Sequence, residues 1–366
     1  MRYIDEFRDP ATAARLVDRI KRLARGRRLR LMEFCGGHTH AIGRYGLGRL
    51  LAPEVDLLSG PGCPVCVTSA TDLDYAVALA AVPDLVLATF GDMMRVPGSA
   101  GRSLMHARSE GADVRLVYSP LDALALAQQL PDRPVVLLGV GFETTAPGVA
   151  ATLLQAESQT VDNLLLLSLH KTTPPAMRAI LCGGDTNLDG IIGPGHVSAV
   201  TGSDAWQFVP EEYGIGVAVS GFEPLDMLQA IASLIEMAVE QRPRVENCYG
   251  RGVDAHGNAA AQTLLKRCFA PSDAEWRGLG ALEESGLALI TDLQHRDVRA
   301  LYPLDVDRAP EPPGCRCGDV LRGVLLPTAC PLFGRRCTPR DPVGPCMVSA
   351  EGSCAAYYRY AEVQDA

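Results

Sequence analysis

Residues 29–40 read LRLMEFCGGHTH. The first half of this stretch is short and mostly apolar, which predicts a β-strand, and the glycine pair behind it predicts a turn into the next element. Further apolar segments at 55–58, 85–90 and 114–118 each run into a loop that contains glycine or proline. Strands that alternate with helices and end in such loops are typical of a parallel α/β sheet, so the sequence predicts this fold class.

The same pattern returns farther along the chain. Gly-Pro-Gly occurs at 60–62 and again at 193–195, each time after an apolar segment, and this repetition indicates two similar α/β units. We predict a first parallel-sheet α/β domain over 1–120, a second over 121–224, and a mixed, cysteine-rich domain with an iron–sulfur cluster over 225–366. The later strand candidates are 135–140, 164–169, 191–192 and 217–220.

The composition excludes several classes of protein. The chain has 366 residues, of which 47% are hydrophobic and 21% charged, and these values predict a globular protein with more than one domain. Its formal net charge of -9 gives no electrostatic reason to bind phosphate backbones, so we expect no nucleic-acid partner. The segment 1–7 lacks an apolar signal core, and runs such as 164–169 are far below the roughly 20 residues that cross a bilayer. We expect a cytoplasmic protein without a membrane partner.

The chain contains twelve cysteines, which is many for a reducing compartment where structural disulfides are rare. Cys182, Cys248 and Cys268 are scattered, and we expect them to be small buried hydrophobic residues. Half of the cysteines crowd into the tail, which begins at Glu311 and has little apolar periodicity, so bonds to a metal would help to keep it folded. The tail cysteines are Cys315, Cys317, Cys330, Cys337, Cys346 and Cys354.

The number and spacing of the tail cysteines favour an iron–sulfur cluster. Four thiolates hold either a cubane cluster or a structural zinc ion, so the tail has two thiols to spare. Zinc ribbons present two Cys-x2-4-Cys pairs, and the tail lacks that spacing; zinc and an unmetallated tail remain the alternatives. The Cys-x3-Cys-x2-Cys signature of radical-SAM enzymes is also absent, so we expect no radical chemistry.

Cys35 stands between the first predicted strand and a predicted helix, with His38 and His40 close by. Backbone N–H groups at a helix start lower the pKa of a thiol, so Cys35 is predicted to be a thiolate at neutral pH, and thus a nucleophile or a soft metal ligand. A small buried residue is the alternative. Gly36 and Gly37 leave room for another molecule to approach the backbone, which favours a functional role.

Cys63-Pro64-Val65-Cys66 has the Cys-x-x-Cys spacing of thiol–disulfide exchange, in which one thiolate attacks and its neighbour resolves. A metal site or a structural role remains open for this pair. Two other patterns, Glu143-Thr144-Thr145 and His196, follow strand candidates, and sites in α/β sheets usually lie at that edge. An ordinary hydrogen-bonded loop histidine is an equally good interpretation of His196.

Four motifs together resemble the HypD family of [NiFe]-hydrogenase maturation factors, and the resemblance covers nearly the whole chain. They are residues 33–40 (EFCGGHTH), 60–66 (GPGCPVC), 141–147 (GFETTAP) and 346–352 (CMVSAEG). The resemblance implies a scaffold on which an Fe(CN)2(CO) unit is built, in complex with HypC and with cyanide delivered by HypE. It also implies two related α/β domains and a C-terminal domain that carries a [4Fe–4S] cluster.

The resemblance further implies roles for individual residues. Cys35 would hold the iron being assembled, and His38, Cys63 and Cys66 would join it as catalytic residues. Cys317 and Cys354 would form a nearby redox pair, or would serve as alternative ligands. The main competing hypothesis is a cluster-dependent thiol–disulfide oxidoreductase that acts on a protein substrate, and a third is a binding module with a zinc-stabilised tail. The implied cluster ligands are Cys315, Cys330, Cys337 and Cys346.

Overall fold

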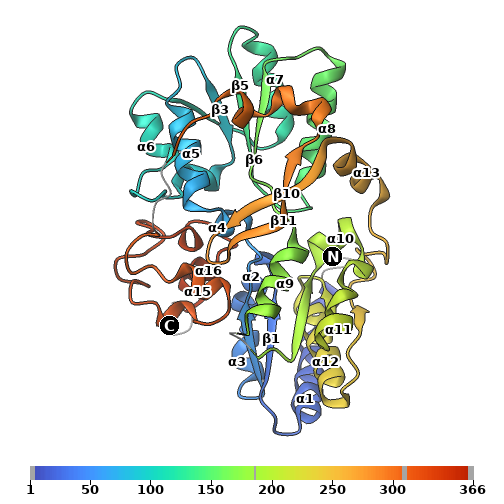
Figure 1. The fold of residues 1–366 in the computed structure, drawn as a ribbon. Coiled ribbons are helices and arrows are strands. Elements are labelled where there is room, and N and C mark those ends of the chain that lie inside the picture. Colours follow the sequence, from blue (N-terminus) through green and yellow to red (C-terminus); the bar gives the residue numbers. More distant parts are fainter. Residues whose placement is uncertain (1–4, 185–186, 307–310, 362–366) are drawn as a thin grey trace.

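A computed structural model describes residues 5–184, 187–306 and 311–361. Figure 1 shows two α/β lobes, one above the other, with a two-stranded hairpin between them and the tail beside the lower lobe. Each lobe is built on a parallel sheet, and the cysteines gather in the C-terminal region. The predicted fold class is therefore confirmed.

The lower lobe contains a five-stranded parallel sheet in the order β2-β1-β7-β8-β9. Helix α12 packs on β7 and β8, and α1 packs on α12, so that their apolar faces bury one side of the sheet. The strands are β1 (Leu29–Glu33), β2 (Val55–Ser59), β7 (Gly190–Pro194), β8 (Gly216–Ser220) and β9 (Val245–Asn247). The helices are η1 (Asp5–Phe7), α1 (Pro10–Ala24), α2 (Gly36–Tyr45), α3 (Leu47–Leu51), α4 (Pro64–Val67), α9 (Thr173–Gly183), α10 (Gly195–Thr201), η3 (Ser203–Trp206), α11 (Phe208–Tyr213) and α12 (Pro224–Glu240).

The upper lobe contains a four-stranded parallel sheet in the order β4-β3-β5-β6. Its central strands are continuous apolar runs because helices cover both faces. The strands are β3 (Val86–Thr89), β4 (Asp113–Leu116), β5 (Val135–Gly139) and β6 (Leu164–Ser168). The helices are α5 (Ala70–Ala80), η2 (Gly91–Arg95), α6 (Leu104–Ser109), α7 (Pro120–Gln129), α8 (Ala146–Ser158), α13 (Ala259–Cys268), η4 (Thr291–Arg296) and α14 (Val298–Leu301).

The two sheets cut across the predicted boundary at residue 120. Strands β3 and β4 precede that boundary but belong to the upper sheet, whereas β7 and β8 follow it and return to the lower sheet. Strand β7 pairs with β1 in parallel, with Leu31 opposite Gly190. Both Gly-Pro-Gly segments therefore lie in the lower lobe, at the carboxyl ends of the two strands that flank β1. The interpretation that each marks a separate unit is wrong. Strand pairing between segments this distant in sequence leaves no local signal.

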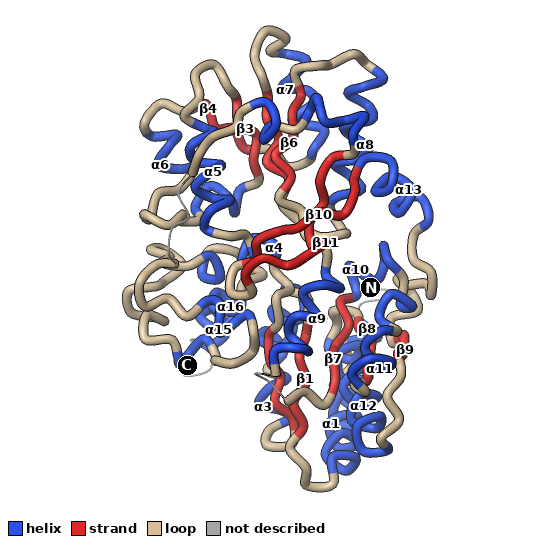
Figure 2. Tube along the Cα trace, in the orientation of Figure 1, coloured by secondary structure: helices blue, strands red, loops and turns tan. Residues whose placement is uncertain are grey.

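The hairpin between the lobes consists of antiparallel strands β10 (Phe269–Trp276) and β11 (Gly280–Leu289), and it crosses the molecule between the two parallel sheets (Figure 2). An isolated bridge joins Thr68, just behind α4, to Trp276 at the end of β10. Another joins Lys171, behind β6, to Gly286. The hairpin therefore connects the two lobes by backbone pairing.

The tail has only short helices, and α16 packs against α2 of the lower lobe. Its buried cysteines belong to the same apolar cluster as Cys63 and Cys66, so the tail is a part of the main core rather than an appendage. Among the described helices, none has both the length and the apolar composition needed to cross a membrane. The tail helices are α15 (Cys317–Leu321), η5 (Pro327–Ala329), η6 (Pro345–Met347) and α16 (Ser353–Ala361).

Candidate functional site

Cys35 lies at the carboxyl end of β1, immediately before the first residue of α2. Glu33 holds this turn in place: one of its carboxylate oxygens accepts the Cys35 N–H at 2.7 Å, and the other accepts the Thr39 hydroxyl. Burial of the Glu33 carboxyl raises its pKa to about 7. Sequence reasoning missed Glu33 as a supporting residue, although its place inside the EFCGGHTH motif was visible.

Cys35 is 8% exposed, and burial, followed by the nearby Glu33 carboxyl, raises the pKa of its thiol to about 12. The backbone N–H groups of Gly37 and His38 lower the pKa, but by less. In the free chain Cys35 is therefore a protonated thiol at neutral pH, and the predicted thiolate is wrong, because desolvation outweighs the helix start. A bound metal ion would still displace the proton.

A stack of three rings stands beside Cys35. Phe222 lies between His38 and His196, with ring centroids 4.8 Å and 3.9 Å away. The Nδ1 atom of His196 is 3.8 Å from the Cys35 sulfur. The histidine that contacts Cys35 is thus His196, in the first turn of α10 directly after β7. The alternative interpretation of His196 as a loop histidine is wrong, because helix α10 begins at Gly195.

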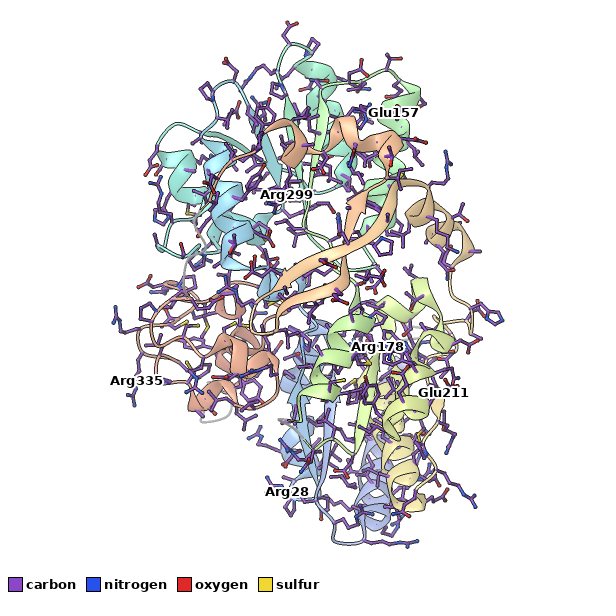
Figure 3. All side chains as sticks on the ribbon, viewed as in Figure 1. Arg28, Glu157, Arg178, Glu211, Arg299 and Arg335 are labelled. Carbon is purple, nitrogen blue, oxygen red and sulfur yellow. A yellow bond between two sulfur atoms is a disulfide. The ribbon has the colours of Figure 1, made fainter. Side chains whose placement is uncertain are left out.

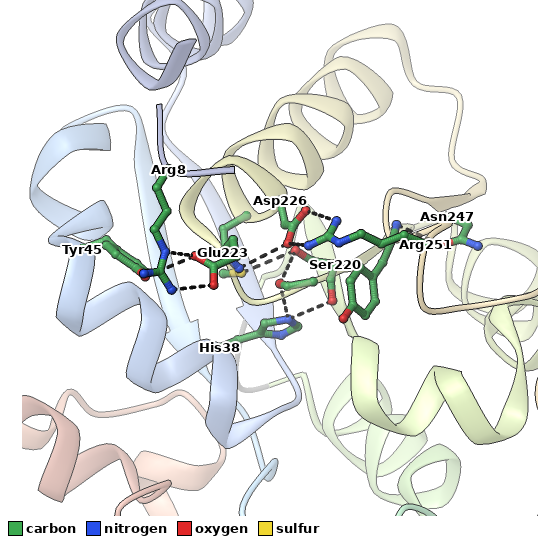
Figure 4. A network of polar contacts seen from close by, with 11 residues as sticks. Arg8, His38, Tyr45, Ser220, Glu223, Asp226, Asn247 and Arg251 are labelled. Atoms are coloured by element: carbon green, nitrogen blue, oxygen red, sulfur yellow. Dashed lines mark hydrogen bonds and ion pairs between the residues drawn. The ribbon is translucent and has the colours of Figure 1, made fainter. Parts of the chain in front are cut away.

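His38 bonds to the backbone instead. Its Nε2 lies 3.1 Å from the carbonyl oxygens of Ser220 and Gly221, so Nε2 carries the proton and donates it (Figure 4). Burial lowers the pKa of His38 to about 4, so the ring is neutral. Its Nδ1 is buried and has no hydrogen-bond partner within the described residues. These contacts give His38 a role in fixing the end of β8 against α2.

The Gly60–Cys66 loop lies directly against the Cys35 loop, because β1 and β2 are neighbours in register, with Glu33 opposite Ser59. The Gly36 N–H donates to the Gly62 carbonyl at 3.0 Å. Cys63 and Cys66 are joined by a disulfide, and both are buried. The structure therefore places this cysteine pair and Cys35 on adjacent turns at one edge of the lower sheet.

The tail closes over the same edge. A Cβ atom on Gly36 would come within 2.5 Å of the Glu351 Cβ atom, so only glycine admits this approach. The Tyr360 hydroxyl lies 2.7 Å from Nε2 of His40. Three of the four sequence motifs thus meet at one place.

The fourth motif lies apart, behind β5 in the upper lobe. The Glu143 carboxylate accepts the backbone N–H of Thr173 at 2.7 Å and its hydroxyl at 3.0 Å. The predicted position at a strand end is confirmed. Both carboxylate oxygens are occupied by Thr173 at the start of α9, which indicates a structural role.

All six tail cysteines line one cavity. The sulfurs of Cys317 and Cys346 are 2.8 Å apart, and Cys346 hydrogen-bonds to both Cys317 and Cys354. Hydrogen bonds from Cys315 and Cys346 hold the pKa of the Cys317 thiol well below its ordinary value. Of the scattered cysteines, Cys268 is buried as predicted, whereas Cys182 is exposed.

The thiols around this cavity decide which kind of metal centre it suits. Across residues 5–184, 187–306 and 311–361, no three His, Cys, Asp or Glu side chains are grouped to hold a single metal ion. The thiols instead surround a shared space whose other lining includes Val320, Leu332, Phe333 and Met347. Several soft thiol donors around one apolar space fit a cluster better than a lone zinc ion.

A family model described as "HypD: Hydrogenase formation hypA family" matches residues 11–361. The chain belongs to the HypD family. It is 48% identical to "Hydrogenase maturation factor HypD" of Azotobacter vinelandii, an alignment that covers 100% of this chain and 98% of that relative. It is 44% identical to the protein of the same name from Escherichia coli (strain K12), over 98% of each chain. Membership of the HypD family gives the chain a role in hydrogenase maturation.

The contact between the Cys35 and Cys63 loops makes Gly62 sensitive to substitution. A Cβ atom there would lie 2.3 Å from the Cys35 nitrogen and 2.5 Å from its Cα atom, and backbone atoms cannot move aside cheaply. We expect Gly62→Ala to destabilise the fold by about 2 kcal/mol. Gly48 is a matched control, because it lies within α3 and its added Cβ would meet nothing within 4 Å.

Gly48→Ala should stabilise the protein slightly, by about 0.5 kcal/mol, since alanine favours a helix over glycine. The midpoint of urea unfolding measures both variants. Equal midpoints for Gly62→Ala and the wild type would contradict the close packing of the two loops.

Proposed function

We propose that this chain is the scaffold on which the Fe(CN)2(CO) unit of [NiFe]-hydrogenase is assembled, working with HypC and HypE. The observation that carries the proposal is the meeting of Cys35, the Cys63–Cys66 pair and the Glu351 turn at one edge of the lower sheet. A soft metal ligand and a redox-capable pair on adjacent turns suit iron that must receive cyanide and carbonyl.

Cys35 is proposed to hold the iron unit as a thiolate, with a second thiolate supplied by HypC. Because the pKa of the free thiol is about 12, iron can bind only if the proton leaves. Burial lowers the pKa of His196, so this ring is neutral and its Nδ1, 3.8 Å from the sulfur, can accept that proton. The proposed division of labour is therefore ligation by Cys35 and proton acceptance by His196.

The tail cavity is proposed to hold a [4Fe–4S] cluster on Cys315, Cys330, Cys337 and Cys346, with Cys317 and Cys354 as the spare thiols. Such a cluster, when bound, supplies single electrons. The polypeptide contributes the apolar lining that keeps water from the thiols, and the η6 turn around Cys346 packs against α4, which carries the Cys63–Cys66 pair. This packing supports electron exchange between the tail and the pair.

The pair is proposed to serve cyanide transfer from HypE. Release of cyanide from a thiocyanate-like carrier consumes two electrons and leaves a thiol on the carrier, and oxidation of the Cys63/Cys66 dithiol to the disulfide releases two. The competing hypothesis, a thiol–disulfide oxidoreductase that acts on a protein substrate, uses the same buried pair, of which Cys63 is 3% and Cys66 0% exposed. It predicts no cyanide or carbonyl bound to the chain, so the infrared measurement below separates the two functions.

Two measurements test the proposal. Anaerobically purified protein should be brown and contain about four iron atoms per chain. Its complex with HypC should show infrared bands of bound cyanide and carbonyl, which absorb where proteins do not. Colourless protein with stoichiometric zinc would contradict the proposed cluster. A HypC complex that binds iron without these bands would contradict the proposed scaffold role.

Cys63→Ala and Cys66→Ala should each retain the iron of the tail but block hydrogenase maturation. Neither residue lines the tail cavity, so the iron content should stay at the wild-type value. Cys268→Ala is the control, because Cys268 is equally buried but lies at the end of α13. Iron content and hydrogenase activity of cells that carry each variant are the readouts. Loss of tail iron in either variant of the pair would mean that the pair has a structural or ligand role.

A further inference from the structure

The turn of the β10–β11 hairpin packs on the cysteine tail. Gly278 has a φ of +80°, and a Cβ atom there would come within 2.5 Å of the Gly318 Cα atom. Gly318 directly follows Cys317, one of the thiols of the tail cavity. The hairpin turn therefore lies against the backbone that positions Cys317.

Arg277, in the same turn, is bonded to the chain just behind the Cys63–Cys66 disulfide. Its backbone N–H donates to the Val67 carbonyl at 2.9 Å, and its Nε donates to the Thr68 carbonyl at 3.1 Å. The residue thus stands between the disulfide loop and the tail cavity. Its backbone and side chain are both fixed there by hydrogen bonds.

The Arg277 side chain is 1% exposed, and its Nη1 forms an ion pair with Glu311, whose side chain is 47% exposed. Its Nη2 is buried and has no hydrogen-bond partner within the described residues. A buried charge with an unused donor is costly unless negative charge lies near it. After the hydrogen bonds from Cys315 and Cys346, the Arg277 charge is a further cause of the lowered pKa of Cys317, so its field reaches the cavity.

We propose that Arg277 is a positioning residue whose buried positive charge raises the reduction potential of the metal centre in the tail cavity. The inference rests on the proposed [4Fe–4S] cluster. Reduction adds one electron, here from dithionite, without making or breaking a bond, so the centre becomes more negative. A fixed positive charge beside it stabilises the reduced form more than the oxidised form.

The test is a reduction titration of the anaerobically purified full chain with dithionite, followed by the visible and electron paramagnetic resonance signals of the centre. Arg277→Gln removes the charge but keeps an amide donor, and its potential should shift to more negative values. Arg277→Lys keeps the charge and should restore most of that shift. Glu311→Gln removes the counter-charge at a half-exposed position, so its potential should shift in the opposite, positive direction.

Arg296→Gln is the matched control. Arg296 is fully buried, donates to the carbonyls of Val161 and Leu164, and pairs with Glu157. Figure 3 labels Glu157 in the upper lobe, far from the cysteine tail. Its loss should leave the potential unchanged, even if it lowers stability. A purely structural role for Arg277 would not produce shifts of opposite sign in the Arg277 and Glu311 variants.

If Arg277→Gln has wild-type iron content and an unchanged reduction potential, this inference is wrong and the proposed function still stands. If Arg277→Gln fails to fold or to hold iron, Glu311→Gln decides, and an unchanged or negative shift there overturns the inference. A wild-type chain without an iron–sulfur centre overturns the proposed function and this inference with it, so the two failures are distinguishable.

Discussion

Cys35→Ser is expected to abolish the cyanide and carbonyl infrared bands of the complex with HypC, while the iron of the tail stays at the wild-type amount. A serine hydroxyl is a much poorer ligand for soft iron than a thiolate. The change in volume is small, and the cost is the weak contact between the Cys35 sulfur and Nδ1 of His196, which are 3.8 Å apart. We therefore expect the fold to lose only about 1 kcal/mol of stability.

Cys182→Ser is the control for this variant, because Cys182 is an exposed cysteine on α9 whose sulfur contacts the Tyr213 hydroxyl, away from Cys35. Its complex should show the bands at wild-type intensity. Bands of wild-type intensity in Cys35→Ser itself would show that Cys35 is not the iron ligand. His196 or Cys63 would then have to be considered, since both lie at the same edge of the sheet.

Cys346→Ser is expected to lose most of the iron of the tail and to destabilise residues 311–361. Cys346 is 1% exposed, its sulfur lies 2.8 Å from that of Cys317, and it also bonds to Cys354. Because the tail has little apolar periodicity, loss of the metal centre should loosen it as well. Iron content per chain and the rate of proteolysis of the tail measure the two effects.

Cys354→Ser is the matched comparison for Cys346→Ser, because Cys354 lines the same cavity and is also buried, but is proposed as a spare thiol. Cys354→Ser should keep its iron and lose only the redox function of the Cys317/Cys354 pair. The reverse result, with iron retained in Cys346→Ser and lost in Cys354→Ser, would exchange the proposed roles of the two residues.

The local features of the fold could be predicted from the sequence. Strands β1, β2 and β7 lie where apolar segments precede glycine loops, because each pattern follows from the geometry of its own few residues. The crossing of the chain between lobes could not be predicted. Strand β7 pairs with β1 although more than a hundred residues separate them in the sequence. Two parallel strands need a long connection between them, but the sequence of that connection does not say which strands will pair.

The candidate site divides in the same way. Cys35 and the Cys63–Cys66 pair were recognisable because cysteine next to glycine, and the Cys-x-x-Cys spacing, have chemical meaning by themselves. The approach of His196 to Cys35 could not be predicted, since the two residues meet only when β7 pairs with β1 in the sheet. The protonated state of Cys35 was predicted wrongly, because the pKa of a thiol depends on burial by segments that are remote in sequence.

The sequence by itself determined the fold class, the family and the candidate cysteines of the site, because strand periodicity, glycine turns and motif spacing are encoded within short segments. Only the tertiary structure decided which strands share a sheet, which histidine faces Cys35, and that Arg277 stands between the disulfide loop and the tail. These are contacts between segments far apart along the chain, and their energies depend on distance and burial in three dimensions.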